Sequence, residues 1–298
     1  MSQKKLRIGY FADGPWSHRA FEIINNDDRF DIQFIVPRTD TTDMVLSDFS
    51  KKYNIDYFKL DNVNSPSSLE KIKTYDCDVL VSMSFNQIFR KGIINLTPKG
   101  IINCHAGKLP FYRGRNILNW ALINDEKEFG ITVHFVDEGI DTGDIILQDT
   151  FPITDEDDYA SLLEVAFVEC SRLLYDALVK IAENDYERID QKTIHPVGFY
   201  CGRRGVGDEI INWNDTSRNL FNFIRSISTP GPIARTVNNS QEIKINKSRL
   251  IPDVPNYIGT VGQVLSKTES GFLVKTKDSF IEILDVDGKI RVGDKLGK

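Results

Sequence analysis

The first eighty residues repeat one pattern, in which a short apolar run is followed by an amphipathic stretch. The apolar runs are typical of buried strands, and the amphipathic stretches are typical of helices. Pro15 stands where a first helical residue would lie, and Asp13 is expected to cap that helix. The expected strands are 6–12, 32–36, 57–60 and 79–83, and the expected helices follow near 15, 43 and 67. This alternation predicts an α/β fold with a Rossmann-like, doubly wound, mostly parallel sheet.

A longer amphipathic segment covers residues 155–182, where apolar side chains recur at the spacing of a helix. We expect Thr154 to cap this helix and the acidic residues 155–158 to lie at the positive end of its dipole. A metal site is the alternative for these carboxylates, but neither a histidine partner nor calcium-loop spacing accompanies them.

The last third of the chain contains short alternating runs instead of long amphipathic stretches. The expected strands are 241–245, 257–265, 271–276, 280–286 and 290–292, and a short helix is expected to precede them. The glycine-rich stretch 198–207 stands before this part. These features predict two domains, 1–204 and a small β module at 205–298.

Composition excludes several classes of protein. The formal net charge is −6, and the last 94 residues carry 13 basic against 11 acidic side chains, so no strong nucleic-acid footprint is expected. The four cysteines lack the spacing of a zinc site or a disulfide framework. No apolar run approaches the roughly 20 residues of a membrane helix, and the N-terminus lacks a signal-type apolar region. We expect a cytoplasmic protein without a membrane or nucleic-acid partner.

Three polar residues form the candidate catalytic site. Asn103 and His105 are two residues apart at the end of an apolar run, so they point to the same side of the expected strand. Asp141 lies in a glycine-framed acidic turn after the next strand. A carboxamide suits an oxyanion, and an imidazole and a carboxylate suit proton transfer, so the three fit addition to a carbonyl. A structural histidine and a solvated turn remain the alternative, and His134 is assigned to packing or solvent.

Three motifs in this region resemble those of the formyltransferases that use N10-formyltetrahydrofolate. They are Asn103-Cys104-His105, the Leu-Pro-x-x-Arg-Gly loop at 109–114, and the D-x-G-x-D-T-G-D turn at 137–144. The resemblance is sharp from about residue 79 to 149. It is looser in the C-terminal module, which resembles the OB-like C-terminal domain of the family except that Asn212 replaces an aspartate. It implies that Asn103 and His105 flank the formyl carbonyl and that Asp141 assists proton transfer, with no metal.

The resemblance also implies where the folate co-substrate, N10-formyltetrahydrofolate, binds. The loop after the strand 79–83 would contact the pterin, together with the acidic turn. An ordinary helix-starting turn is the alternative for that loop. The implied cofactor-binding residues are Phe85, Asn86, Gln87, Ile88, Asp137, Gly139 and Ile140.

Cationic and aromatic residues near these loops are the candidates for binding the second substrate. Arginine grips phosphate oxygens, and an aromatic ring can stack on a base. Surface charge and a flexible linker are the alternatives. The candidate residues are Trp16, Arg19, Lys108, Arg113, Tyr200, Arg203 and Arg204.

The stretches 13–24 and 107–122 are similar to enzymes that formylate nucleotide-linked amino sugars. The resemblance therefore implies a dTDP- or UDP-linked amino sugar as acceptor, such as dTDP-4-amino-4,6-dideoxyglucose or a dTDP-3-amino sugar, and a homodimer. Methionyl-tRNA is the first alternative acceptor, although a near-neutral C-terminal part does not favour it. A formyltetrahydrofolate hydrolase and a nucleic-acid-binding OB module are the remaining alternatives.

Overall fold

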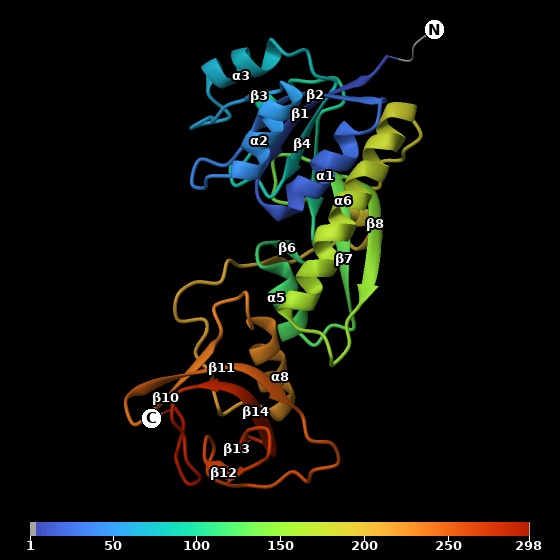
Figure 1. The fold of residues 1–298 in the computed structure, drawn as a ribbon. Coiled ribbons are helices and arrows are strands. Elements are labelled where there is room, and N and C mark those ends of the chain that lie inside the picture. The colour runs from blue at the N-terminus through green and yellow to red at the C-terminus, as the bar shows by residue number, and fades with distance from the viewer. Residues whose placement is uncertain (1–3, 298) are drawn as a thin grey trace. The chain divides into compact units, whose positions relative to one another are not determined.

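The computed structural model describes residues 4–297 and divides into two compact units (Figure 1). Unit 1 comprises residues up to 114, 130–151 and 164–200, and unit 2 comprises 115–129, 152–163 and 201 onward. The expected boundary after residue 204 stays a prediction.

The centre of unit 1 is a seven-stranded sheet with the order β3-β2-β1-β4-β5-β7-β8. Strands β1 to β5 pair in parallel, whereas β7 runs antiparallel to β5. The predicted doubly wound, mostly parallel α/β fold is therefore confirmed. The strands are β1 (Leu6–Ala12), β2 (Phe30–Val36), β3 (Asp56–Tyr57), β4 (Val79–Met83), β5 (Ile101–His105), β7 (Glu128–Phe135) and β8 (Ile145–Pro152).

Helices cover both faces of this sheet (Figure 1). On one face, Phe21 of α1 contacts Tyr10 of β1 and stacks on Phe49 of α2. On the other face, α3 and α4 pack on a core that includes Phe11, Phe34 and Ile101. The helices are α1 (Pro15–Asn25), α2 (Met44–Tyr53), α3 (Pro66–Lys73), α4 (Lys91–Ile94) and α7 (Gln191–Ile194), and α6 spans Tyr159–Glu183.

Two predictions about helix starts are wrong. The cap position of α1 is Gly14, with φ 73°, and Asp13 instead accepts a hydrogen bond from the Thr41 hydroxyl. Helix α6 begins at Tyr159, four residues later than expected, because the acidic residues form a turn ahead of it. Its first turn is closed by Asp158, whose carboxylate accepts from the N–H of Ser161.

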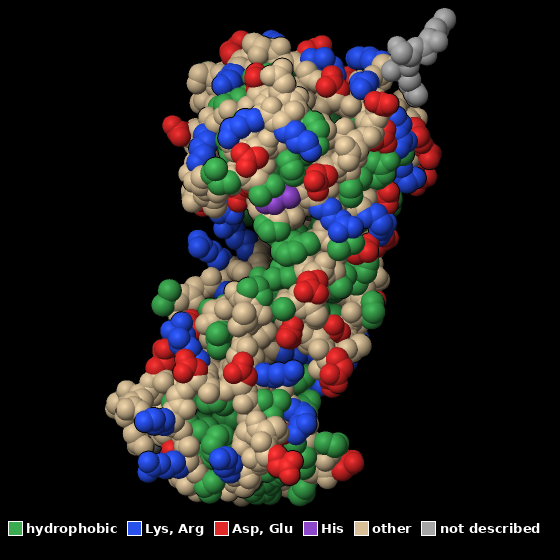
Figure 2. All heavy atoms as spheres, in the orientation of Figure 1, with side chains coloured by type: hydrophobic (Ala, Val, Ile, Leu, Met, Phe, Trp, Pro, Cys, Tyr) green, Lys and Arg blue, Asp and Glu red, His purple; other side chains and the backbone are tan. Residues whose placement is uncertain are grey.

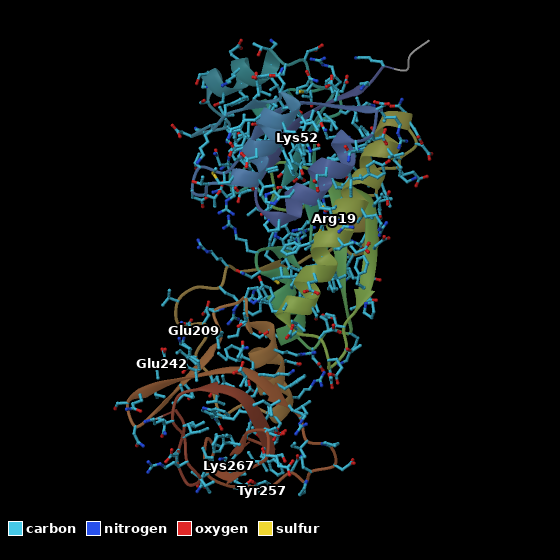
Figure 3. The ribbon with its side chains drawn as sticks, in the orientation of Figure 1. Arg19, Lys52, Glu209, Glu242, Tyr257 and Lys267 are labelled. Carbon is cyan, nitrogen blue, oxygen red and sulfur yellow. The ribbon has the colours of Figure 1, made fainter. Side chains whose placement is uncertain are left out.

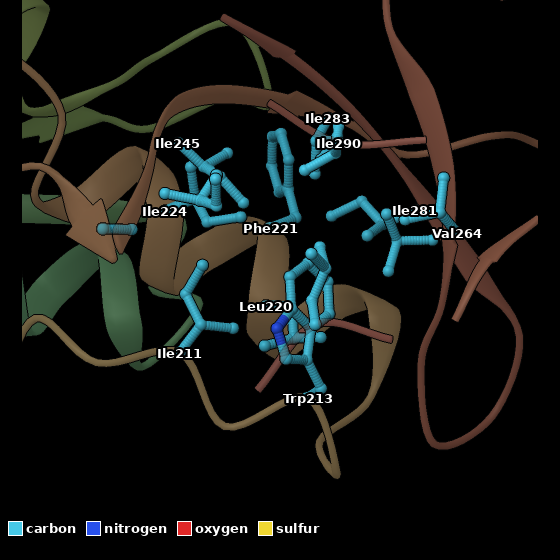
Figure 4. Close-up of a cluster of buried hydrophobic side chains, with 14 of the residues drawn as sticks. Ile211, Trp213, Leu220, Phe221, Ile224, Ile245, Val264, Ile281, Ile283 and Ile290 are labelled. Atoms are coloured by element: carbon cyan, nitrogen blue, oxygen red, sulfur yellow. The ribbon is translucent and has the colours of Figure 1, made fainter. Parts of the chain in front are cut away.

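Unit 2 contains a five-stranded antiparallel sheet with the order β10-β11-β14-β13-β12, as the expected β module requires. Its helix α8 (Ser217–Ser226) lies against the sheet, and Phe221 and Ile224 enter a common apolar core with Trp213 (Figure 4). The strands are β10 (Ala234–Asn238), β11 (Gln241–Arg249), β12 (Val264–Lys267), β13 (Phe272–Lys275) and β14 (Phe280–Asp287), and α5 (Ile117–Ile123) also belongs to this unit.

Two of the expected C-terminal strands differ from the structure. The run 257–265 is irregular until β12 begins at Val264, and residues 290–292 form no strand. Tyr257 and Ile290 pack on neighbouring side chains without pairing in a ladder. Strand β10, which was not predicted, carries only one apolar residue, Val237, after its first position.

The surface charges, the helices and the possible metal ligands can be compared with the classes of protein that composition excluded. Basic and acidic side chains are interspersed on the face shown in Figure 2. Within residues 4–297, none of the helices combines the length and the hydropathy that a bilayer crossing would need. Across the same residues, no group of three or more His, Cys, Asp or Glu side chains could hold a metal ion.

Candidate active site

The candidate site lies at the carboxyl end of β5, inside unit 1. Ile101, Asn103 and His105 alternate along β5, so the two polar side chains lie on the same face as the buried Ile101. β7 runs antiparallel beside them, and its register places His134 opposite Asn103. The site therefore combines the end of a parallel strand with the middle of an antiparallel one.

His105 is buried and contacts two acceptors. Its Nε2 lies 2.8 Å from the carbonyl oxygen of Tyr112, so this nitrogen donates to the carbonyl. Its Nδ1 faces Asp141, with 3.7 Å to Oδ2. A Cβ at Gly107 would lie 2.4 Å from Nε2, so only glycine leaves room for the imidazole here. The ring plane is thus set from two sides, and Nδ1 is turned toward the carboxylate.

Asn103 and His134 form a pair that the sequence did not reveal. The Nδ1 of His134 lies 2.7 Å from the Phe135 carbonyl oxygen and therefore donates to it. Its Nε2, 3.2 Å from Nδ2 of Asn103, can then accept from that amide. This assignment fixes the orientation of the carboxamide and leaves the second Nδ2 hydrogen for an oxyanion. His134 thus belongs to the site, and the prediction of packing or solvent was incomplete.

Asp141 is held between the two imidazoles. Its Oδ1 lies 3.5 Å from Nε2 of His134, and its Oδ2 accepts from the N–H of Gly114 at 2.8 Å. Burial alone would raise the pKa of this carboxyl, but His105 and the Gly114 N–H hold it well below its usual range. The carboxylate is therefore ionised near neutral pH and can accept a proton through His105.

The loop between His105 and Arg113 is fixed from β7 and β8. The Thr132 hydroxyl donates to the Gly107 carbonyl oxygen at 2.6 Å. Gln148 donates to the Thr132 hydroxyl at 2.8 Å and to the Leu109 carbonyl oxygen at 2.9 Å. This network places the Tyr112 carbonyl against His105. Neither Thr132 nor Gln148 is part of a motif that sequence reasoning singled out.

The expected folate-binding residues lie in two loops of unit 1. Gln87 is committed to the fold, because its side chain donates to the Leu60 carbonyl oxygen and accepts from the Val63 N–H. The Asp137 carboxylate closes its own turn by accepting from the Gly139 N–H. Ile88 and Ile140 are about half exposed, at 51% and 50%. Both loops border one apolar cluster, which contains Phe85 and Val136.

Asn86 has an acceptor without a partner. Within the part of the chain that the structure describes, its Oδ1 is buried and lacks a hydrogen bond. Buried polar atoms are rarely left unpaired, so a ligand donor would fit here. This feature agrees with the expected role of the loop.

The candidates for the second substrate are distributed more widely. On α1, Trp16 packs edge-on against Phe167 of α6, with ring centroids 4.7 Å apart, while Arg19 is exposed (Figure 3). Arg113 is occupied, because Nε and Nη2 both donate to Gln191 and its guanidinium lies over the Tyr200 ring. Lys108 lies half-buried in the loop before Arg113.

Arg203 and Arg204 belong to unit 2. Arg204 lies over the rings of Trp120 and Phe223 and donates to the Asp208 carbonyl oxygen. Burial lowers the pKa of its guanidinium. Arg203 is exposed. The structure thus separates these two neighbours, one packed on aromatic rings and one facing solvent.

Comparison with known proteins identifies relatives over almost the whole chain. Residues 28–178 match the family model described as formyl transferase, and residues 206–293 match the model of the formyl transferase C-terminal domain. A methionyl-tRNA formyltransferase of Pelotomaculum thermopropionicum is 32% identical over 233 residues, which cover 78% of this chain and 73% of the relative.

Two solved structures have the same fold over both units. WlaRD, a sugar 3N-formyl transferase solved in the presence of dTDP and 5-N-formyl-THF, superposes with a TM-score of 0.71 at 24% identity, covering 96% of this chain and 100% of the other. An N-formyltransferase from Helicobacter canadensis, in complex with folinic acid and dTDP-3-aminofucose, gives a TM-score of 0.70 at 22% identity, covering 94% and 99%. At these identities the likeness shows the fold.

Proposed function

Since this chain belongs to the formyl transferase family, we propose that it transfers a formyl group from N10-formyltetrahydrofolate to the amine of a nucleotide-linked amino sugar. The observation that carries the proposal is the meeting of Asn103, His105 and Asp141 at the carboxyl end of β5. An amide donor, an imidazole and an ionised carboxylate are the groups that acyl transfer to an amine needs.

In the proposed reaction, the neutral amine of the acceptor attacks the formyl carbon. A carbon–nitrogen bond forms, and the carbonyl oxygen gains negative charge. The free Nδ2 hydrogen of Asn103 stabilises this oxyanion, and so does the imidazole of His105 once its Nε2 hydrogen turns from the Tyr112 carbonyl to the oxyanion. Asp141 accepts the amine proton, and a proton is returned to N10 of tetrahydrofolate as the bond from that nitrogen to the formyl carbon breaks. The products are the formamide and tetrahydrofolate.

Features of the two exposed loops support folate binding. Ile88 and Ile140 offer apolar surface that a flat pterin could cover, and the unpaired Oδ1 of Asn86 offers an acceptor. The ligands of the two solved structures, 5-N-formyl-THF and folinic acid, are consistent with the same co-substrate here. Backbone groups of the loops, not the side chains of Gln87 and Asp137, are then the expected polar contacts.

Three observations support a nucleotide sugar as the acceptor. The connection from β1 to α1 is short and followed by Trp16, which suits a small ligand better than a folded RNA. The chain is acidic overall. The two solved structures with the same fold were obtained with dTDP in one case and with dTDP-3-aminofucose in the other. Lys108, Arg19 and Arg203 remain the candidates for the diphosphate.

Methionyl-tRNA is the second candidate acceptor. It is favoured by the name of the Pelotomaculum relative, which is 32% identical to this chain. A formyltetrahydrofolate hydrolase would use the same three side chains on water. A homodimer also stays a prediction, which sedimentation equilibrium would test.

A formylation assay distinguishes these functions. The enzyme would be incubated with N10-formyltetrahydrofolate and dTDP-4-amino, dTDP-3-amino or UDP-4-amino sugars, with methionyl-tRNA in parallel and an amine-free control. Turnover on one amino sugar is expected. Turnover on methionyl-tRNA alone would show that the acceptor is methionyl-tRNA and not a nucleotide sugar. Tetrahydrofolate release in the amine-free control alone would identify a hydrolase.

A further inference from the structure

Gln191, the first residue of α7, is a buried carboxamide whose partners all belong to the candidate site. Its side chain is enclosed, with 1% of the residue exposed. Its Nε2 donates to the carbonyl oxygens of Asp141 at 2.9 Å and Gly143 at 2.8 Å. Its Oε1 accepts from Nη2 of Arg113 at 2.6 Å. One side chain thus connects two segments that are far apart in the sequence.

The Asp141 backbone needs such support. Its φ is 53°, in the left-handed region that is unfavourable for a residue other than glycine. The turn is also pressed against β7, because a Cβ at Gly143 would lie 1.9 Å from the Phe135 carbonyl oxygen. The two bonds from Gln191 hold the carbonyls on both sides of Thr142, and so they fix the turn in this conformation.

The side-chain oxygen of Gln191 fixes Arg113, which lies next to the residue that bonds the Asp141 carboxylate. Arg113 directly precedes Gly114, and the Gly114 N–H donates to Oδ2 of Asp141. With Nε and Nη2 bound to Gln191 and the guanidinium over Tyr200, the Arg113 side chain is fixed. Gln191 therefore sets both the peptide that carries Asp141 and the peptide that receives its carboxylate.

We propose that Gln191 is a positioning residue that fixes the Asp141 carboxylate relative to His105 and Asn103. It does not contact the reacting atoms and acts through the Asp141 carbonyl and through Arg113. The inference rests on the proposed role of Asp141 in proton transfer. It also assigns Arg113 to this support instead of to phosphate binding.

Gln191→Leu removes all four hydrogen bonds at similar volume. A misplacement of about 1 Å can cost on the order of 10²-fold in rate, so we expect kcat to fall about 10- to 10²-fold with both KM values unchanged within about twofold. The acid limb of the kcat profile should move to higher pH, since the displaced carboxyl loses the contacts that favour its ionised form. The assay uses N10-formyltetrahydrofolate and the acceptor that reacts in the panel above.

Three further variants make the test specific. Gln191→Glu keeps the acceptor for Arg113 but loses both donors to the carbonyls, so it should lower kcat as much as Gln191→Leu does, and it serves if that variant does not fold. Gln33→Leu is the matched control, because the side chain of this half-buried glutamine on β2 donates to the nearby Asp31 carbonyl oxygen and not to the candidate site. Asp141→Asn is measured in parallel.

The outcomes separate the two proposals. If Asp141→Asn keeps wild-type turnover, the proposed catalytic site is wrong. If Asp141→Asn is silent while folded Gln191→Leu and Gln191→Glu keep wild-type kcat, only the positioning role is wrong. A crystal structure of Gln191→Leu tests the inference without the need for an acceptor substrate. The Asp141 Oδ2 to Gly114 N distance should lengthen from 2.8 Å, and an unchanged distance would overturn the inference.

Discussion

Nδ2 of Asn103 lies 3.2 Å from Nε2 of His134, on the neighbouring antiparallel strand. Nδ1 of His134 donates to the Phe135 carbonyl oxygen, so the neutral imidazole has its lone pair on Nε2. This nitrogen therefore accepts a hydrogen bond from the Asn103 amide. The amide is thereby turned so that a donor, and not its oxygen, faces the place where charge would develop.

Replacing His134 should cost nearly as much as removing the amide. We expect His134→Phe to lower kcat by about 10²-fold, since a rotated carboxamide would present its oxygen to the oxyanion. Steady-state formylation assays give the value. The exposed His195 supplies the control His195→Ala, with wild-type turnover. If His134→Phe is fully active, the amide of Asn103 is oriented by something else.

The direct test of the oxyanion donor is Asn103→Ala. Loss of one such donor typically lowers kcat by about 10²–10³-fold. Because Asn103 is only half-buried, the variant should fold like the wild type, as far-UV circular dichroism can verify. Asn95→Ala, at an exposed helix end, is the matched asparagine control. Wild-type kcat in folded Asn103→Ala would contradict the mechanism.

The Asp141 carboxyl should contribute to stability in a pH-dependent way. Its pKa in the folded protein is below the unfolded value of about 3.9, so the unfolded chain binds more protons in acid. The contribution is present above that value and is lost as the pH falls toward the folded pKa. Urea unfolding of wild type and Asp141→Asn should show a free-energy difference that is constant near neutrality and shrinks below about pH 4. A difference that grows in acid would contradict the shift.

The two exposed isoleucines should act on folate binding and not on the fold. Covering one such side chain is worth about 1.5 kcal/mol or more, so Ile88→Ser and Ile140→Ser should each raise the KM for N10-formyltetrahydrofolate about 10-fold. Their melting temperatures should match the wild type, because both side chains are already half exposed. Val206→Ser, at a fully exposed valine, is the control. Unchanged KM values would move the folate site elsewhere.

Sequence patterns predicted the parallel strands well and the antiparallel ones less well. The bounds of β1 and β4 were predicted to the residue, because their apolar runs are buried on both faces and end at turn residues. In the C-terminal module, 257–265 and 290–292 have apolar residues but do not pair along their length. There, tertiary packing decides which runs become strands, and periodicity does not record it.

The site was predicted as far as its motifs extend. Asn103, His105 and Asp141 come together, although their chemical roles stay predictions. His134 was missed because its place opposite Asn103 depends on strand register, and Gln191 was missed because it lies fifty residues after the turn that it holds. The role of Arg113 in substrate binding stays a prediction. A cation next to a catalytic motif suggests phosphate binding, but its partner is a buried amide.

The position of β5 affects the order in which the protein loses activity and unfolds in denaturant. β5 is paired on both sides inside the sheet, whereas Asp141 lies on a turn that is secured largely by side chains. Segments with few backbone hydrogen bonds to neighbouring strands unfold locally before the rest of the protein. In mild denaturant, the 137–144 turn should therefore detach while Asn103 and His105 keep their places, so inactivation would precede unfolding and reverse rapidly on dilution.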